Sequence, residues 1–169
     1  MKELLIVDGY NILHGWGELK KTLEKDFDHA RMRLIDILGN YQAVKGIKVV
    51  LVFDAHLVKG GTGSRENIAG VDVIYTTEGE TADMLIEKLV SQLGEKERIT
   101  VATSDWTEQR IVFGKGAIRL SARELEKEVS DSNDEVQEHF GPLQNDDRKL
   151  RCQLDERVRE TLEEIRRQK

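Results

Sequence analysis

The sequence predicts an α/β fold, a three-layer sandwich in which helices cover both faces of a central parallel sheet. Short apolar segments alternate over residues 1–120 with segments whose apolar residues have helical spacing. The segment 49–53 is apolar at every position, which is typical of a strand that is buried on both faces. At 169 residues, the chain is long enough to bury about 70% of its extended surface.

The first part of the chain is expected to form two strands around one long helix. Four apolar residues at 4–7 predict the first strand. A helix over about 27–44 follows, because its apolar residues recur three and four positions apart, and Gly46 ends it. The second strand is 49–53, and the glycine-rich residues 55–70 are expected to form a flexible loop.

The middle of the chain continues the alternation of strand and helix. In chain order we expect a strand at 71–75, a helix from about residue 80, a strand at 99–102, a short helix at 105–113 and a strand at 117–120. Strands that are joined through helices pair in parallel and cross over with the right hand. This connectivity supports the three-layer prediction.

Only helical patterns follow residue 121. We expect helices at 122–129 and 150–165, with Pro142 between them. The chain is therefore expected to divide into a main domain over 1–130 and a charged helical C-terminal extension over 131–169. A single cysteine excludes an internal disulfide and a metal site made of thiolates.

The charge pattern limits the classes of partner. The net charge of −6 argues against a passive coat protein that binds nucleic acid through charge alone. The charge is uneven, with two basic and nine acidic side chains over 121–147 but eight basic and five acidic over 148–169. The apolar run near the N-terminus is far too short for a signal peptide or a membrane span, so we expect a cytoplasmic protein.

Carboxylate side chains follow several of the predicted strands. Asp8, Asp54 and Asp105 each come at or shortly after the end of a strand. Glu80 and Asp83 open the helix that follows the third strand. Because ligands of parallel α/β sheets bind beyond the carboxyl ends of the strands, we expect these chain-distant acids to converge at one edge.

Each of these acids also has a purely structural interpretation, as a turn residue or a helix cap. Together, however, carboxylates that are packed closely repel one another, which raises the pKa of at least one of them. One or two Mg²⁺ or Mn²⁺ ions would remove the repulsion, and hard oxygen ligands suit these ions better than zinc. Such sites hydrolyse phosphodiester bonds with a metal-bound water.

Other residues near this edge are candidates for binding a substrate. Asn11, Thr103 and Ser104 carry polar groups that suit phosphate or outer-shell water. Trp16, between two glycines in an expected polar loop, is a candidate for stacking on bases. Basic candidates for phosphate contacts are Lys59, Arg65, Lys115, Arg119 and Arg123. The alternatives are core packing for the tryptophan and an ordinary solvated surface for the basic residues.

Five segments of the chain resemble a known family. They are LLIVDGYN at 4–11, VVLVFDAHLVKG at 49–60, ETAD at 80–83, VATSDWTEQ at 101–109 and FGKGAIRLSARELEKEV at 113–129. In this order they resemble the YacP-like branch of the NYN domains, which belong to the PIN-like superfamily. The resemblance covers the main domain, and its relatives include ribosome-associated bacterial endoribonucleases that cleave mRNA.

The resemblance implies a PIN-like nuclease domain that hydrolyses single-stranded RNA with Mg²⁺ or Mn²⁺ and leaves 5′-phosphate and 3′-hydroxyl ends. It also implies mRNA as substrate and the ribosome as partner. By position, Asp8, Asp83 and Asp105 are implied as the catalytic, metal-holding acids, and Asp54 and Glu80 as further metal-binding helpers. The resemblance implies nothing about the oligomeric state.

Two other classes of function remain as alternatives. A signalling receiver domain has similar layering, but it needs an acidic pair after the first strand and a lysine after the last. Here the first strand ends in Val-Asp-Gly-Tyr and the last is followed by Ser121, which disfavours a receiver. The second alternative is a catalytically silent module of the same fold that binds RNA or the ribosome.

Overall fold

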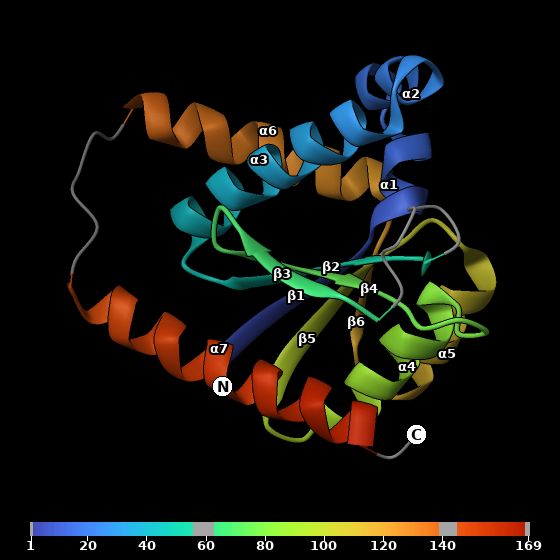
Figure 1. The fold of residues 1–169 in the computed structure, drawn as a ribbon. Coiled ribbons are helices and arrows are strands. Elements are labelled where there is room, and N and C mark those ends of the chain that lie inside the picture. The colour runs from blue at the N-terminus through green and yellow to red at the C-terminus, as the bar shows by residue number, and fades with distance from the viewer. Residues whose placement is uncertain (1, 56–62, 139–144, 168–169) are drawn as a thin grey trace.

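A computed structural model describes residues 2–55, 63–138 and 145–167, without the side chains of 106, 108, 136–138 and 145–155. The strands are β1 (Lys2–Asp8), β2 (Lys48–Phe53), β3 (Arg65–Ile68), β4 (Val71–Tyr75), β5 (Glu97–Ala102) and β6 (Ile118–Leu120). They form one sheet in the order β3-β4-β2-β1-β5-β6 (Figure 1). All five strands that the sequence predicts are present.

The centre of the sheet is parallel, as predicted. β1 lies between β2 and β5, with Val7 opposite Leu51 on one side and Ala102 on the other. β4 and β6 extend the parallel arrangement on the two sides. Every residue of β2 is buried, which confirms that helices cover both faces of this strand.

β3 corrects the prediction of a loop over 55–70. Its residues pair antiparallel with β4, with Ile68 opposite Val71. Between them, Ala69 and Gly70 have φ angles of 53° and 83°, as the two central residues of a type I′ hairpin turn require. The sequence hides this strand because Arg-Glu-Asn-Ile has one apolar residue, and an edge strand tolerates polar ones. Residues 56–62, and with them Lys59, lie outside the described residues.

The helices form the outer layers of the sandwich. They are α1 (Gly9–Gly15), α2 (Gly17–Lys25), α3 (Phe27–Lys45), α4 (Ala82–Leu93), α5 (Trp106–Gly114), α6 (Ala122–Glu138) and α7 (Asn145–Arg167). In Figure 1, α1, α3 and α6 cover one face of the sheet, and α4, α5 and α7 cover the other. The three-layer α/β architecture is therefore confirmed.

α1 and α2 occupy the segment in which the sequence predicts only a polar loop around Trp16. Asp8 caps α1, and Trp16 forms the junction between the two helices. Both helices are short, at seven and nine residues, so their apolar spacing gives little signal. α3 matches its prediction and ends at Gly46, whose φ of 67° is the left-handed conformation typical of a helix C-terminus.

The C-terminal helix α7 contributes to the core of the fold. Val158, Leu162 and Ile165 belong to the apolar cluster that also contains Val52 of β2 and Leu85 of α4. α6 packs on the opposite face through residues such as Leu125 and Val129. The division of the chain at residue 130 stays a prediction. Within the described part, no helix is long and apolar enough to span a membrane.

Candidate active site

Acidic residues gather at the edge of the sheet where the parallel strands end. Asp8 is the last residue of β1, Asp54 follows β2, and Asp105 lies three positions after β5. The strand order places β2, β1 and β5 side by side, so these three acids come from neighbouring strands. In Figure 1 this edge is on the right, where α1 and α4 begin. We call it the acidic edge.

The start of α4 is tied to this edge by Asp54. The Ala82 backbone N–H donates to Asp54 Oδ1 at 2.7 Å, which joins the end of β2 to the first residue of α4. Asp83, in the first turn of α4, is exposed. Glu80 is held differently, because Lys88 Nζ donates to its Oε2 at 2.9 Å and its side chain is only 6% exposed. Lys88 therefore balances the charge of Glu80, a pairing that the sequence does not reveal.

Asp8 is held by the helix that it starts. Its Oδ1 accepts from the Asn11 backbone N–H at 3.3 Å, and the residue is 8% exposed. Gly9 is the next residue, and its backbone packs closely against the sheet. A Cβ at this position would lie 2.4 Å from the Phe53 ring. A glycine is therefore needed here for α1 to begin directly after β1.

Hydrogen bonds connect the end of β1 to the loop after β5. Asn11 Oδ1 accepts from the Ser104 backbone N–H at 2.7 Å, and Thr103 Oγ1 accepts from the Asp105 N–H at 3.1 Å. Ser104 Oγ accepts in turn from the Ala122 N–H at 3.0 Å, at the start of α6. These contacts fix the backbone around Asp105, and the roles of Asn11, Thr103 and Ser104 toward a substrate stay predictions.

Trp16 lies in the core rather than in a polar loop. It is 5% exposed, and its indole N–H donates to the Ala122 carbonyl oxygen at 2.7 Å. The structure therefore favours core packing over base stacking for this residue. Sequence reasoning could not find this contact, because its two partners are 106 residues apart.

The basic candidates do not form one cluster. Lys115 lies at the opposite edge of the sheet, since α5 carries the chain back before β6 begins, and its Nζ contacts Ser91 Oγ at 2.8 Å and Glu87 at 3.6 Å. Arg119 lies over the Phe113 ring, with 5.8 Å between the guanidinium carbon and the ring centroid. Arg123 is exposed in the first turn of α6, beside the acidic edge.

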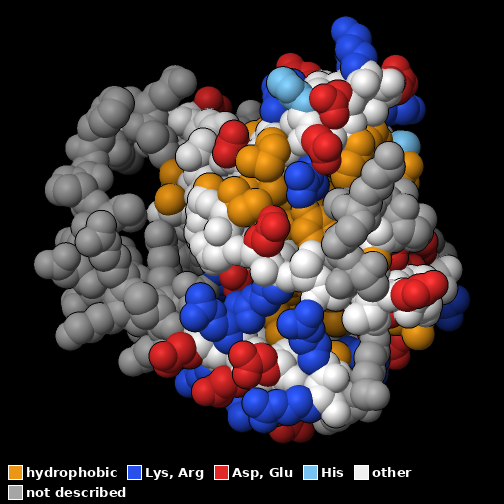
Figure 2. Space-filling model, viewed as in Figure 1, with side chains coloured by type: hydrophobic (Ala, Val, Ile, Leu, Met, Phe, Trp, Pro, Cys, Tyr) orange, Lys and Arg blue, Asp and Glu red, His pale blue; other side chains and the backbone are white. Residues whose placement is uncertain are grey.

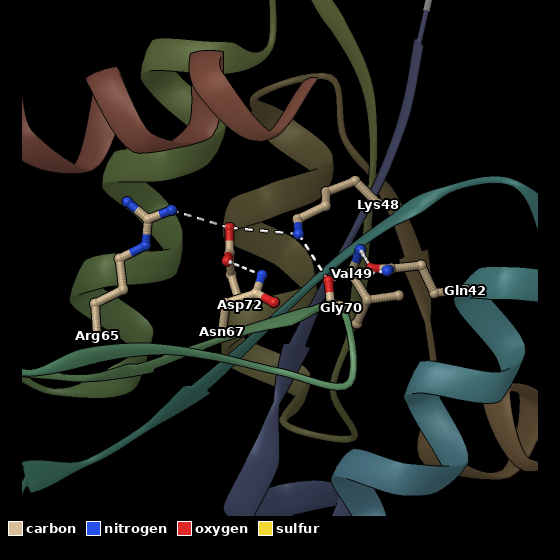
Figure 3. Close-up of polar contacts among 7 residues, drawn as sticks. All are labelled: Gln42, Lys48, Val49, Arg65, Asn67, Gly70 and Asp72. Carbon is tan, nitrogen blue, oxygen red and sulfur yellow. Dashed lines mark hydrogen bonds and ion pairs between the residues drawn. The ribbon is translucent and has the colours of Figure 1, made fainter. Parts of the chain in front are cut away.

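Arg65 belongs to a buried polar network around β3, β4 and β2 (Figure 3). Its guanidinium contacts Asp72 at 3.2 Å, and Lys48 Nζ lies 3.5 Å from the same carboxylate. Lys48 and Asp72 are each 1% exposed. Lys48 Nζ also donates to the Gly70 carbonyl oxygen at 2.9 Å, which holds the hairpin turn between β3 and β4.

One exposed aromatic residue lies beside Asp8. Tyr10 is 36% exposed and packs edge-on against His14, with 4.3 Å between the ring centroids. The two rings line a shallow depression of about 400 Å³, together with Lys20, Glu24 and Phe27. An aromatic next to a lysine is a combination suited to an unpaired nucleotide.

The donor chemistry of the acidic edge fits a hard divalent cation. Asp8, Asp83 and Asp105 offer carboxylate oxygens, the ligands that Mg²⁺ and Mn²⁺ prefer. Among the described residues, no three side chains of the Asp, Glu, His or Cys type are close enough to hold a metal ion together. Mg²⁺ is commonly held by one or two carboxylates, with water and substrate phosphate completing its shell, so the residues present fit the ion.

Comparisons with known proteins agree with the fold. The sequence model of the family of YacP-like NYN domains matches residues 5–167. YacP of Bacillus subtilis (strain 168) is 42% identical over 166 residues, which are 98% of this chain and 97% of that protein. The crystal structure of Rae1 (YacP) from Bacillus subtilis matches with a TM-score of 0.69 over 97% of this chain and 94% of that chain. A mutant of the same protein matches with the same TM-score over 82% of this chain and 80% of that chain. The chain therefore belongs to the family of YacP-like NYN domains.

Proposed function

We propose that this protein is a metal-dependent endoribonuclease that hydrolyses single-stranded RNA, specifically mRNA on the translating ribosome. The products would be 5′-phosphate and 3′-hydroxyl ends. The observation that carries the proposal is the placement of Asp8, Asp54 and Asp105 at the ends of three neighbouring strands. Membership of the NYN family, which belongs to the PIN-like nucleases, supports it.

In this proposal the acidic edge holds the cation and the scissile phosphate. Asp8, Asp83 and Asp105 would hold Mg²⁺ or Mn²⁺, one or two of them contacting any one ion, with Asp54 and Glu80 as helpers. When bound, such a cation lowers the pKa of a coordinated water and neutralises charge on the phosphoryl oxygens. Asp8, at the end of β1, lies between Asp54 after β2 and Asp105 after β5. Asp83 and Asp105 are both exposed, so the edge is open to a chain of RNA.

Residues around the edge offer contacts for the rest of the nucleotide chain. Arg123, which is exposed, would contact a phosphate, and the partly exposed ring of Tyr10 would stack on a base. Asn11 and Ser104 support the edge by holding its backbone in place. Cleavage would then depend on how a partner such as the ribosome presents unpaired RNA to this edge.

The experiment that tests the proposal is mapping of RNA ends after incubation with translating ribosomes and Mg²⁺. Wild-type protein and the Asp8→Asn variant are compared, each also with the same RNA stripped of ribosomes. We expect new 5′-phosphate ends with the wild type and at least about a hundredfold fewer with the variant, because a metal-holding carboxylate is lost. Cuts only on ribosomes would support ribosome dependence, and undiminished cutting by the variant would remove the metal-site proposal.

A catalytically silent module that binds RNA or the ribosome is the second candidate. It is favoured by the structural roles that three of the acids have, because Asp8 caps α1, Asp54 accepts from the Ala82 N–H and Glu80 pairs with Lys88. Under this alternative, wild type and Asp8→Asn would bind RNA or ribosomes equally, and neither would produce new ends.

A further inference from the structure

A pocket opens beside the acidic edge, between β4, the segment that leads into α4, and α7. Its volume is about 260 Å³. This is slightly below the roughly 300–1,000 Å³ of pockets for drug-sized ligands, so the space suits a single ring system. Gly63 and Thr77 are among the residues that line it.

The wall of the pocket is largely apolar. Ile74 from β4, Leu85 from α4, and Leu162 and Ile165 from α7 line it, and all four are buried. Against such a surface a free phosphate or a hydrated ion would lose part of its water. It suits instead the flat, weakly hydrated faces of an aromatic ring.

The charged groups of the pocket each have a protein partner. Arg65 is paired with Asp72 at 3.2 Å, and Glu80 with Lys88 at 2.9 Å. Arg166 donates to the Gly63 carbonyl oxygen and lines the pocket together with Glu163. Two arginines and two glutamates line the pocket, so it offers hydrogen-bond donors and acceptors at its rim.

The polar network in Figure 3 fixes the position of the Arg65 guanidinium. Asp72 accepts from Asn67 Nδ2 at 2.8 Å as well as from Arg65, and it is compensated by Lys48. Because Asp72 is 1% exposed, this carboxylate cannot turn away to solvent. Arg65 is thus a preorganised donor, which lowers the entropic cost of recognising the edge of a ligand.

We propose that this pocket binds one unpaired nucleobase of the RNA chain next to the acidic edge. The proposal rests on the proposed function, because Glu80 lines the pocket and Asp83 follows it in the first turn of α4. A base inserted here would have its faces between the apolar walls and its edge toward Arg65 and Glu163, which offer a donor and an acceptor. Enzymes that act on RNA read splayed bases through this combination of stacking and edge contacts.

The test is a titration of the ¹⁵N-labelled full chain with the four nucleosides, followed by NMR without any added metal. Nucleosides carry the base and no phosphate, and ribose 5-phosphate is titrated in parallel as the probe that has no base. We expect at least one nucleoside to shift the amide signals of Gly63, Thr77 and Leu85, and ribose 5-phosphate to leave them unchanged. Because no cleavage is measured, the result is independent of the Asp8→Asn assay.

A matched pair of variants locates the binding. Glu163 and Glu164 are adjacent and both exposed on α7, and only Glu163 lines the pocket. Glu163→Trp places an indole over the opening, so we expect nucleoside binding to weaken at least about tenfold, whereas Glu164→Trp removes the same charge and leaves binding unchanged. Absence of shifts in the wild type, equal shifts with ribose 5-phosphate, or equal binding by both variants would each overturn the proposal.

Discussion

Asp8 combines two tasks in one carboxylate. It caps the first turn of α1 by accepting the Asn11 backbone N–H, and it places a negative charge at the end of the central strand. Asparagine is as good a helix cap as aspartate. The Asp8→Asn variant therefore keeps the cap and removes the charge, so loss of cleavage in this variant would report on the charge rather than on the fold.

Tyr41 makes the stability of the fold depend on pH in the alkaline range. Its hydroxyl donates to Glu128 Oε2 at 2.8 Å, between α3 and α6. Burial, and then the contact with this carboxylate, raise the pKa of Tyr41 above its usual value. A raised pKa in the folded state means that Tyr41 contributes stability below the unfolded pKa of about 10 and that this contribution is lost as pH rises above it.

We therefore predict that Tyr41→Phe costs about 1 kcal/mol of unfolding free energy at pH 8, the usual value for one hydrogen bond. Above pH 10 the wild type should lose stability faster than the variant, which has no hydroxyl to ionise at this position. Urea denaturation of both proteins at pH 8 and above pH 10 measures the difference in unfolding free energy. A constant gap between the two proteins across this range would contradict the assignment.

At the scale of elements, the junction of β1 and α1 leaves no room for a side chain at Gly9. A Cβ placed 2.4 Å from Phe53 meets a ring that cannot yield, since Phe53 is fully buried and packs against both Phe27 and Tyr75. We predict that Gly9→Ala costs about 1–3 kcal/mol of unfolding free energy through overpacking. It should also shift Asp8 and lower cleavage.

The matched control for this prediction is Gly17→Ala at the start of α2. A Cβ there would meet nothing within 4 Å, so the substitution should leave the stability unchanged or raise it slightly. Urea denaturation of both variants makes the comparison. If the two substitutions change the unfolding free energy equally, the close approach to Phe53 is not the cause of the cost at position 9.

The elements that the sequence predicts are those with a strong local signal. α3 has apolar residues over five turns and a glycine at its end, and β2 is apolar throughout. β3 and the helices α1 and α2 are short, so the spacing of their apolar residues gives little signal. The acidic edge was predictable because the end of each strand is readable locally, whereas the pairing of Glu80 with Lys88 depends on side-chain geometry.

At the scale of the whole molecule, an ion pair between a half-exposed arginine and a buried glutamate joins α7 to the sheet in addition to apolar contacts. Arg157 Nη1 lies 2.6 Å from Glu97 Oε1, and the Glu97 side chain is fully buried at the start of β5. Its other oxygen, Oε2, has no hydrogen-bond partner among the described residues. Arg157 is therefore the main compensation for a buried negative charge.

We predict that Arg157→Met destabilises the fold by roughly 3 kcal/mol, because it leaves a buried carboxylate uncompensated. Adding Glu97→Gln should recover part of the loss, since a neutral amide costs less to bury than a charge. Arg159→Met, at an exposed position of the same helix, is the control. If the double variant proves as unstable as Arg157→Met alone, the charge of Glu97 is not the cause.

The surface of the molecule gives little support for binding RNA through charge alone. Figure 2 shows acidic and basic side chains interleaved over the lower part of the visible face, where α7 lies in Figure 1. The net charge of −6 agrees with this mixture. A nuclease with such a surface would rely on its metal ions and on a partner that delivers RNA, instead of on long-range attraction to phosphate.

The cation should therefore have a measurable effect on the whole fold. Acids at one edge repel one another, and an ion that binds only the native state stabilises it by mass action. At a Mn²⁺ concentration 100 times its Kd, the gain is about 2.7 kcal/mol, or a rise in Tm of about 5–10 °C for a chain of this size. The Asp8→Asn/Asp105→Asn double variant should show no such rise, because two of the three proposed metal-holding carboxylates are lost. Calorimetry with and without Mn²⁺ makes the measurement, and equal shifts in both proteins would place the binding of Mn²⁺ away from the acidic edge.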